Sequence, residues 1–260
     1  MQNESSLAVS TRLIGMLTPS SNTVLEPYTS LLLQPLFPDV TAHFGRFRVT
    51  RIALDEDANE QFKQEPILSA ADLLADARPD VLAWNGTSAS WLGFDTDQRL
   101  CDAIESRTGV PATSAILSLN RLLAERGVER IALVTPYTAD VEEKIAGNYA
   151  RIGISTVARR HSGLSDNFSF AEVSEQTIEA MCEDVATAKP DAIAIVCTNM
   201  RGAIVGAEVE RRTGVPVFDS VSFTLWGCLR ALGVSMAPLA RFGTMFADDG
   251  RISARSPAEA

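Results

Sequence analysis

The chain has 260 residues, a formal net charge of −10 and 46% hydrophobic residues. This composition is ordinary for a globular protein, and the excess of acidic residues disfavours nucleic acid, which binds basic surfaces. Because no apolar run reaches the roughly 18–20 residues that cross a bilayer and the polar N-terminus lacks the pattern of a signal peptide, we expect a cytoplasmic protein that does not bind membranes.

Short apolar runs alternate with amphipathic segments of helical length along the chain. Strands are predicted near residues 13–18, 41–49, 80–85, 111–113, 130–135, 154–160, 192–197 and 216–218. Helices are predicted near residues 24–35, 67–77, 96–107, 115–127, 138–151, 171–188, 202–213 and 220–232. This alternation predicts an α/β protein of parallel sheets with helices on both faces. The sequence after Met236 is polar and rich in Ala, Ser and Asp, and its last ten residues are expected to be loose.

One sequence pattern occurs twice, at an offset of 111 residues. Residues 78–80, Arg-Pro-Asp, lead through an apolar strand to Asn85-Gly86-Thr87-Ser88, and residues 189–191, Lys-Pro-Asp, lead through another to Cys197-Thr198-Asn199. Each unit continues into a helix that ends in Arg-Thr-Gly-Val-Pro. The repeat predicts two similar parallel-sheet halves related by pseudo-twofold symmetry, with a site in the cleft between them.

The repeat also gives the predicted boundaries of the two halves. Two halves of roughly 110–120 residues fit the usual size of a domain. We assign residues 12–113 and 223–248 to the first α/β half and residues 114–222 to the second, with flexible ends at residues 1–11 and 249–260. A monomer and a small homo-oligomer are both compatible with this acidic chain.

Four short loops that follow predicted strands consist mainly of small residues with hydroxyl or amide groups. They are Pro19-Ser20-Ser21-Asn22, Asn85-Gly86-Thr87-Ser88, Thr135-Pro136-Tyr137 and Cys197-Thr198-Asn199. Ligands of parallel α/β sheets bind beyond the carboxyl ends of the strands, where these loops are expected. Each loop precedes a predicted helix, whose free N–H groups and partial positive charge suit a carboxylate. The sequence therefore predicts a binding site for a small carboxylate.

Cys197 is the candidate catalytic residue. It follows a strand and precedes a predicted helix, so the helix dipole and nearby N–H groups are expected to favour its thiolate. The alternative is a small buried residue at a strand end. Cys101, Cys182 and Cys228 lie within amphipathic helices, where we expect them to pack in the core. The cysteine spacing and the two histidines indicate neither disulfides nor a metal site.

The other candidate residues each have a structural alternative. Thr87 and Ser88 have hydroxyls that suit either an oxyanion or the capping of a helix. Asn22 suits either a ligand or an Asx turn. Tyr137 follows a strand end, where a phenol either reaches into the cleft or packs beside it. Asn167 lies in a predicted loop, and a turn is as compatible with it as a site.

Gly86 stands where the repeat places a partner for Cys197. One interpretation is that a second proton donor is missing, because one thiol suits protonation of one face of a planar intermediate and two thiols suit a racemase. The alternative is a turn with a positive φ angle, which favours glycine. No GxGxxG, GxxxxGK[ST] or GxSxG motif is present, so we expect a site that uses no cofactor.

From about Leu13 to Phe246 the chain resembles the aspartate/glutamate racemase superfamily, and most closely its branch of arylmalonate decarboxylases and maleate cis–trans isomerases. The run Gly86-Thr87-Ser88 is similar to a loop of the decarboxylases. Tyr137 is similar to their carboxylate-binding tyrosine, and Cys197 to their single catalytic cysteine.

Other residues resemble the isomerases instead. Pro19-Ser20-Ser21-Asn22-Thr23 is similar to their first loop, and Cys197-Thr198-Asn199-Met200-Arg201 to their second cysteine loop. Asn167 falls near a further asparagine of the isomerases. Gly86 departs from this pattern, because isomerases and racemases carry their first cysteine there. The chain therefore combines features of both enzymes.

The resemblance implies a substrate with a carboxylate on an activated carbon. The residues implied to bind this group or to lie beside it are Asn22, Thr87, Ser88, Tyr137, Thr198, Pro19, Ser21, Gly86, Asn167 and Asn199. Loss of CO2 or of a proton would place negative charge on the carboxylate as an enediolate, which Cys197 would protonate on one face.

We therefore expect a cofactor-independent decarboxylase with one catalytic cysteine, acting on a small activated carboxylate or dicarboxylate. One alternative is an isomerase, of the maleate or racemase type, that acts on a small dicarboxylate. The isomerase route needs a thiolate that adds to a double bond, and the loop of Gly86 offers no such nucleophile. A third possibility is a catalytically silent carboxylate-binding protein.

Overall fold

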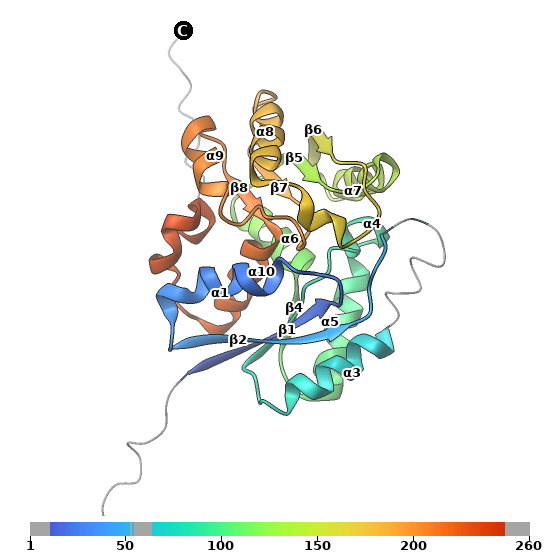
Figure 1. Ribbon diagram of the computed structural model, residues 1–260, viewed down its shortest axis with the longest axis vertical. Helices are drawn as coiled ribbons and strands as arrows, with labels where there is room; N and C mark the ends of the chain where they lie inside the picture. The colour runs from blue at the N-terminus through green and yellow to red at the C-terminus, as the bar shows by residue number, and fades with distance from the viewer. Residues whose placement is uncertain (1–10, 53, 55–63, 248–260) are drawn as a thin grey trace, which may run out of the picture.

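Two parallel sheets form the centre of the protein, which is described here from a computed structural model covering residues 11–52, 54 and 64–247 (Figure 1). The first sheet has the order β2-β1-β3-β4 and the second has the order β6-β5-β7-β8. Their strands are β1 (Arg12–Pro19), β2 (Val40–Phe47), β3 (Val81–Trp84), β4 (Ala112–Ser114), β5 (Arg130–Thr135), β6 (Ser155–His161), β7 (Ala192–Ile195) and β8 (Val217–Asp219). The same order in both sheets confirms two similar α/β halves.

Helices connect the strands in the alternation that the sequence predicted. The α-helices are α1 (Leu25–Leu33), α3 (Gln64–Ala75), α4 (Ala89–Leu92), α5 (Asp95–Thr108), α6 (Ala115–Glu125), α7 (Ala139–Arg151), α8 (Glu175–Ala186), α9 (Gly206–Thr213) and α10 (Ser220–Leu232). The 3₁₀ helices are η2 (Gln34–Leu36), η3 (Ser169–Glu172), η4 (Ala237–Phe242) and η5 (Thr244–Phe246). Every strand and α-helix predicted from the sequence is present; β5 and α10 have the predicted ends, and the others have at least one end shifted by one to four residues.

The largest differences from the prediction lie in short segments. Helix α9 was expected from residue 202 but begins at Gly206, because turns occupy the residues that follow Cys197. Helix α8 begins four residues later than expected, and a separate 3₁₀ turn precedes it. The short helix α4 and the segments η4 and η5 were not predicted. The expected flexible ends lie outside the described residues, apart from Thr11.

The central strands are buried on both faces. All four residues of β3 and all four of β7 are buried, as parallel strands between helical layers must be. Equivalent helices of the two halves end in the same way: Gly109 after α5 and Gly214 after α9 have φ angles of 71° and 69°. Glycine adopts this left-handed conformation at little cost. Gly109 and Gly214 are therefore equivalent positions in the two halves, and they relate the halves independently of the strands.

Helix α10 joins the two halves. It packs against α6 and α1, and also against β3, β4 and β8, so it contacts both sheets. In Figure 1 it lies between them, beside the C-terminal 3₁₀ segments. Leu239, Met245 and Phe246 of these segments are buried. The buried side chains of both halves form one continuous hydrophobic cluster.

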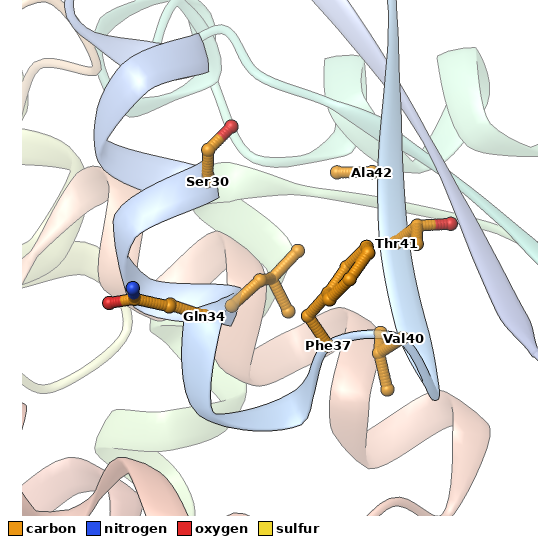
Figure 2. Close-up of a pocket in the computed structure, with 7 residues that line it drawn as sticks. Ser30, Gln34, Phe37, Val40, Thr41 and Ala42 are labelled. Atoms are coloured by element: carbon orange, nitrogen blue, oxygen red, sulfur yellow. The ribbon is translucent and has the colours of Figure 1, made fainter.

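A surface groove lies between α1 and the edge strand β2 (Figure 2). Its lining residues are Ser30, Leu33, Gln34, Phe37, Val40, Thr41 and Ala42. None of them is a candidate site residue. Within the described ranges, no helix is both long and apolar enough to cross a membrane.

Candidate active site

The loops that follow the central strands β3 and β7 meet where the two halves join. Thr198 Oγ1 donates a hydrogen bond of 3.0 Å to the carbonyl oxygen of Asn85. Thr87 Oγ1 lies 2.7 Å from the hydroxyl of Tyr137 in the other half. These four side chains are buried, as is Cys197. The structure thus brings together the loops that the sequence repeat paired.

Cys197 is a buried thiol, and only 3% of the residue is exposed. Burial raises its pKa to about 12, although hydrogen bonds from the Asn199 backbone and the Tyr137 side chain act in the opposite direction. The Asn199 N–H lies 3.3 Å from the sulfur. At neutral pH the group is therefore a protonated thiol.

This state corrects the sequence-based expectation of a thiolate. The helix that was to lower the thiol pKa starts at Gly206, nine residues after Cys197, so its N-terminus does not begin at the cysteine. Desolvation is the largest influence on the thiol. A buried site disfavours the charged form of a thiol.

Tyr137 connects the thiol to the first half. Its hydroxyl interacts with both Thr87 and Cys197. Its ring packs edge-on against Trp91 and Phe170, with ring centroids 5.3 and 5.4 Å away. Burial raises the pKa of Tyr137 well above its usual value, so the phenol stays neutral. The arrangement is a line of hydroxyl, phenol and thiol across the junction.

The hydroxyls of Thr87 and Ser88 do not cap helix α4. Ser88 is the N-cap residue of this helix, yet its side chain makes no capping hydrogen bond. The Thr87 hydroxyl pairs with Tyr137. The capping interpretation of these residues is therefore wrong, and both groups remain available to a ligand.

Asn22 forms a turn just before helix α1 and contacts the cysteine loop. Its Oδ1 accepts hydrogen bonds of 2.9 Å from the N–H groups of Val24 and Leu25. Its Nδ2 donates to Thr198 Oγ1 at 3.2 Å. Pro19 ends β1 and its carbonyl accepts the Asn22 N–H, which closes the loop. The turn-forming role of Asn22 is observed, and its amide also reaches the junction.

Asn199 and Asn167 tie three loops together. Asn199 Oδ1 accepts the Thr23 N–H at 3.0 Å, and its Nδ2 donates to the Asn167 carbonyl at 2.5 Å. Asn167 Nδ2 in turn donates to Ser21 Oγ at 2.7 Å. Asn167 is buried although it lies far from both loops in sequence. All the residues predicted for the site thus lie in one connected region.

Gly86 is a glycine because Trp84 lies against it. Its φ angle is not positive, so the backbone interpretation of this glycine is wrong. A Cβ atom at Gly86 would collide with the six-membered ring of Trp84. The Trp84 ring packs against Phe47 at 4.9 Å, and its side chain hydrogen-bonds the carboxyl of Asp97.

Two buried carboxyl groups near the site were missed by the sequence analysis. Burial raises the pKa of both Asp97 and Asp219 to about 7. Asp219 is the last residue of strand β8, and this position at the end of an apolar run was the signal available in the sequence. No group of three or more His, Cys, Asp or Glu residues that could hold a metal ion occurs in residues 11–52, 54 and 64–247.

Two parallel-sheet α/β halves of one topology, joined where the loop of Cys197 meets the loop of Asn85, define a protein of the class that includes arylmalonate decarboxylases and maleate isomerases. Within this class the chain belongs to the arylmalonate decarboxylase family, whose model matches residues 14–246.

Known relatives include both enzymes of the branch. The chain is 29% identical over 240 residues to arylmalonate decarboxylase of Bordetella bronchiseptica. The aligned region covers 91% of this chain and 97% of the relative. It is 24% identical over 230 residues to maleate isomerase of Geobacillus stearothermophilus, covering 85% and 92%. At these identities the comparisons support both activities, and they do not select between them.

Solved structures of both enzymes share the fold. A crystal structure of arylmalonate decarboxylase superposes with a TM-score of 0.72 at 27% identity, covering 90% of this chain and 98% of that one. A mutant of Nocardia farcinica maleate cis–trans isomerase, with a covalently bound succinylcysteine intermediate, has a TM-score of 0.84 at 21% identity, covering 92% and 99%. The second likeness concerns the fold alone.

Proposed function

We propose that the protein is a cofactor-independent lyase of the arylmalonate decarboxylase type. It removes CO2 from a small activated dicarboxylate and protonates the product through Cys197. The observation that carries the proposal is the asymmetry of the junction. One half presents a protonated thiol, and in the other half Trp84 fills the space beside Gly86 where a second side chain would stand.

The substrate carboxylate that remains in the product binds at the junction. This carboxylate accepts hydrogen bonds from the hydroxyls of Thr87, Ser88 and Tyr137 and from the backbone amide of Thr198. None of the three hydroxyls caps a helix, so they can bind a ligand. Negative charge grows on this carboxylate as CO2 leaves, because the electrons of the broken C–C bond form an enediolate. Each such donor is worth roughly 3–4 kcal/mol of barrier.

The thiol of Cys197 then protonates the α-carbon from one face. The new C–H bond takes the thiol proton, and the thiolate that remains accepts hydrogen bonds from the Asn199 N–H and the Tyr137 hydroxyl. A proton from water restores the thiol before the next turnover. A high pKa suits this role, because a general acid must hold its proton until the carbanion forms.

The isomerase route is the alternative for this family. It needs a thiolate that adds to a double bond, and the raised pKa of Cys197 opposes that form at neutral pH. A catalytically silent carboxylate-binding protein is the other alternative. The proposed reaction differs from both in releasing CO2.

The test is incubation of the whole protein with a panel of α-substituted malonates. We expect CO2 release and, in D2O, one deuterium at the α-carbon of a product with a single configuration. Cys197→Ala should lose activity, whereas Cys228→Ala, which changes another buried free thiol, should retain it. Turnover of maleate without CO2 release from any malonate would establish the isomerase instead. Ligand-induced thermal stabilisation without any product would indicate a silent binding protein.

A further inference from the structure

A second pocket, of about 560 Å³, lies between helices α4 and α7. The two helices pack against each other, and each one begins just after a site loop, α4 after Thr87-Ser88 and α7 after Thr135-Pro136-Tyr137 (Figure 1). The groove of Figure 2, by contrast, lies at the start of strand β2, whereas site loops follow the carboxyl ends of the strands. The pocket between α4 and α7 is therefore the one that adjoins the site loops.

The pocket borders the site through one residue of each helix. Trp91 of α4 lines it, and the Trp91 ring packs edge-on against Tyr137 with 5.3 Å between the centroids. Asn148 of α7 also lines it, and its Nδ2 donates a hydrogen bond of 2.9 Å to the carbonyl oxygen of Ser90. The Ser90 hydroxyl in turn donates to the Thr87 carbonyl at 2.6 Å. One side chain, Trp91, thus stands between the pocket and Tyr137.

The reacting groups are buried, so a substrate needs a route to them. Cys197 is 3% exposed and Tyr137 is 2% exposed. The pocket brings solvent to within one side chain of Tyr137, whose hydroxyl interacts with the thiol. This closeness makes the pocket a candidate entrance to the site.

Helix α7 gives the pocket a cationic side. Lys144 and Arg151 both line it, and their spacing of seven residues places them on one face of the helix, about 10 Å apart along its axis. Among the described residues neither side chain forms an ion pair, and Arg151 donates a hydrogen bond of 3.1 Å to Asn148 Oδ1. Both charges are therefore available to an anion.

The acidic residues of the pocket already have partners. Glu143 forms an ion pair with Arg159. Asp140 interacts with the Thr138 hydroxyl and with backbone N–H groups at the start of α7. The chain as a whole has a net charge of −10 and repels a small anion. A local excess of positive charge in a hollow raises the concentration of such an anion there.

Gly147 lies between the two cations and also lines the pocket. Its φ angle is not positive, and a Cβ atom there would meet nothing within 4 Å, so neither the backbone nor packing requires a glycine. A glycine inside a helix costs about 1 kcal/mol relative to alanine. What the missing side chain provides is open space in the pocket.

We propose that the pocket between α4 and α7 is the entrance through which a small dicarboxylate reaches the buried thiol of Cys197. Lys144 and Arg151 attract its carboxylates, and Gly147 keeps the passage open. That the ligand is a dicarboxylate rests on the proposed function, whereas the route to the thiol can be tested without any turnover.

The test compares two small thiol reagents on the whole protein, neutral methyl methanethiosulfonate and anionic 2-sulfonatoethyl methanethiosulfonate. Peptide mass spectrometry separates the modification of Cys197 from that of the other three free cysteines. In the wild type, added salt should slow the anionic reagent more than the neutral one, because salt screens the attraction of the exposed cations.

Lys144→Gln should slow the anionic reagent about threefold at low salt, as the loss of one unit charge at close range in water implies, and leave the neutral reagent unchanged. Lys189→Gln is the matched control. Lys189 precedes strand β7, at the opposite end of the sheet from the site loops, so this variant should leave both rates unchanged. With a malonate that the wild type decarboxylates, Lys144→Gln should raise KM and retain kcat.

Gly147→Leu tests the passage by its width. It should slow both reagents severalfold, and Gly147→Ala should slow them less. Leucine is a better helix former than glycine, so urea unfolding should show that the Leu variant is at least as stable as the wild type. Slower access in a variant that is no less stable cannot be attributed to misfolding.

Four results would overturn the inference. They are a ratio of anionic to neutral rates that is unchanged in Lys144→Gln, an equal change in Lys189→Gln, wild-type rates in Gly147→Leu, and no modification of wild-type Cys197 by either reagent. The proposed function fails separately: a protein that passes these tests but releases no CO2 from malonates has the entrance without the decarboxylase activity. One that decarboxylates malonates but fails them has the activity and another route.

Discussion

The indole of Trp84 occupies the space that a side chain on Gly86 would need. Trp84 ends strand β3, and its ring contacts Phe47 of strand β2 and Asp97 of helix α5. The asymmetry between the two site loops is therefore a matter of packing. One loop has a thiol, and the other has no room for a side chain at the equivalent position.

Gly86→Ala is expected to destabilise the protein by about 1–3 kcal/mol, because the added methyl group must displace a buried indole. Gly147→Ala is the matched control. Gly147 lies in helix α7, and a Cβ atom there meets nothing within 4 Å. This control should stabilise the protein by up to about 1 kcal/mol through helix propensity. Urea unfolding of the two variants measures the difference, and equal stabilities would contradict the packing argument.

Tyr137→Phe should lower kcat by roughly 10²–10³, because it removes a hydroxyl that contacts both Thr87 and Cys197. Tyr149→Phe is the control, since the Tyr149 hydroxyl is buried without a hydrogen-bond partner within the described residues. Steady-state decarboxylation of a malonate that the wild type accepts provides the measurement. Comparable losses in the two variants would show that ring packing, and not the hydroxyl, is what matters.

Asn199→Ala should destabilise the protein by roughly 1–3 kcal/mol. It leaves the Thr23 N–H and the Asn167 carbonyl without their side-chain partner at a buried junction. Asn120→Ala, on helix α6, removes an amide whose Oδ1 has no partner within the described residues, and it should cost little. Thermal unfolding of both variants checks the expectation. A small effect at Asn199 would mean that water replaces these hydrogen bonds.

The pH dependence of stability should report the two buried aspartates. Asp97 and Asp219 have folded-state pKa values of about 7 against an ordinary value of 3.8, so between these pH values the folded protein binds more protons than the unfolded chain. The free energy of unfolding therefore falls as pH rises from about 4 to about 7, by up to about 1.4 kcal/mol per pH unit for each group.

Asp97→Asn and Asp219→Asn should each reduce that slope. Urea unfolding at several pH values between about 4 and 8 provides the measurement. The free energy of unfolding of each variant, relative to that of the wild type, should be greater at the higher pH. An unchanged slope in both variants would mean that neither carboxyl titrates in this range. The buried Glu142 and the half-buried Glu210, whose pKa values burial also raises, should account for part of the slope that remains.

The sequence was sufficient to predict the order of strands and helices, the two similar halves, and the loops that meet at their junction. These features depend on local patterns: apolar runs, the glycines that end α5 and α9, and the rule that site loops follow the carboxyl ends of parallel strands. The repeat also related Gly86 to Cys197 before their surroundings were known.

Only the tertiary structure decided the state of Cys197, the reason for Gly86 and the burial of Asp97 and Asp219. A thiol pKa depends on burial and on charges brought near by folding, and the space beside a glycine depends on a side chain such as Trp84 whose orientation is set by the core. Sequence spacing encodes which residues can share an edge of a sheet. It does not encode the desolvation and packing that those residues meet there.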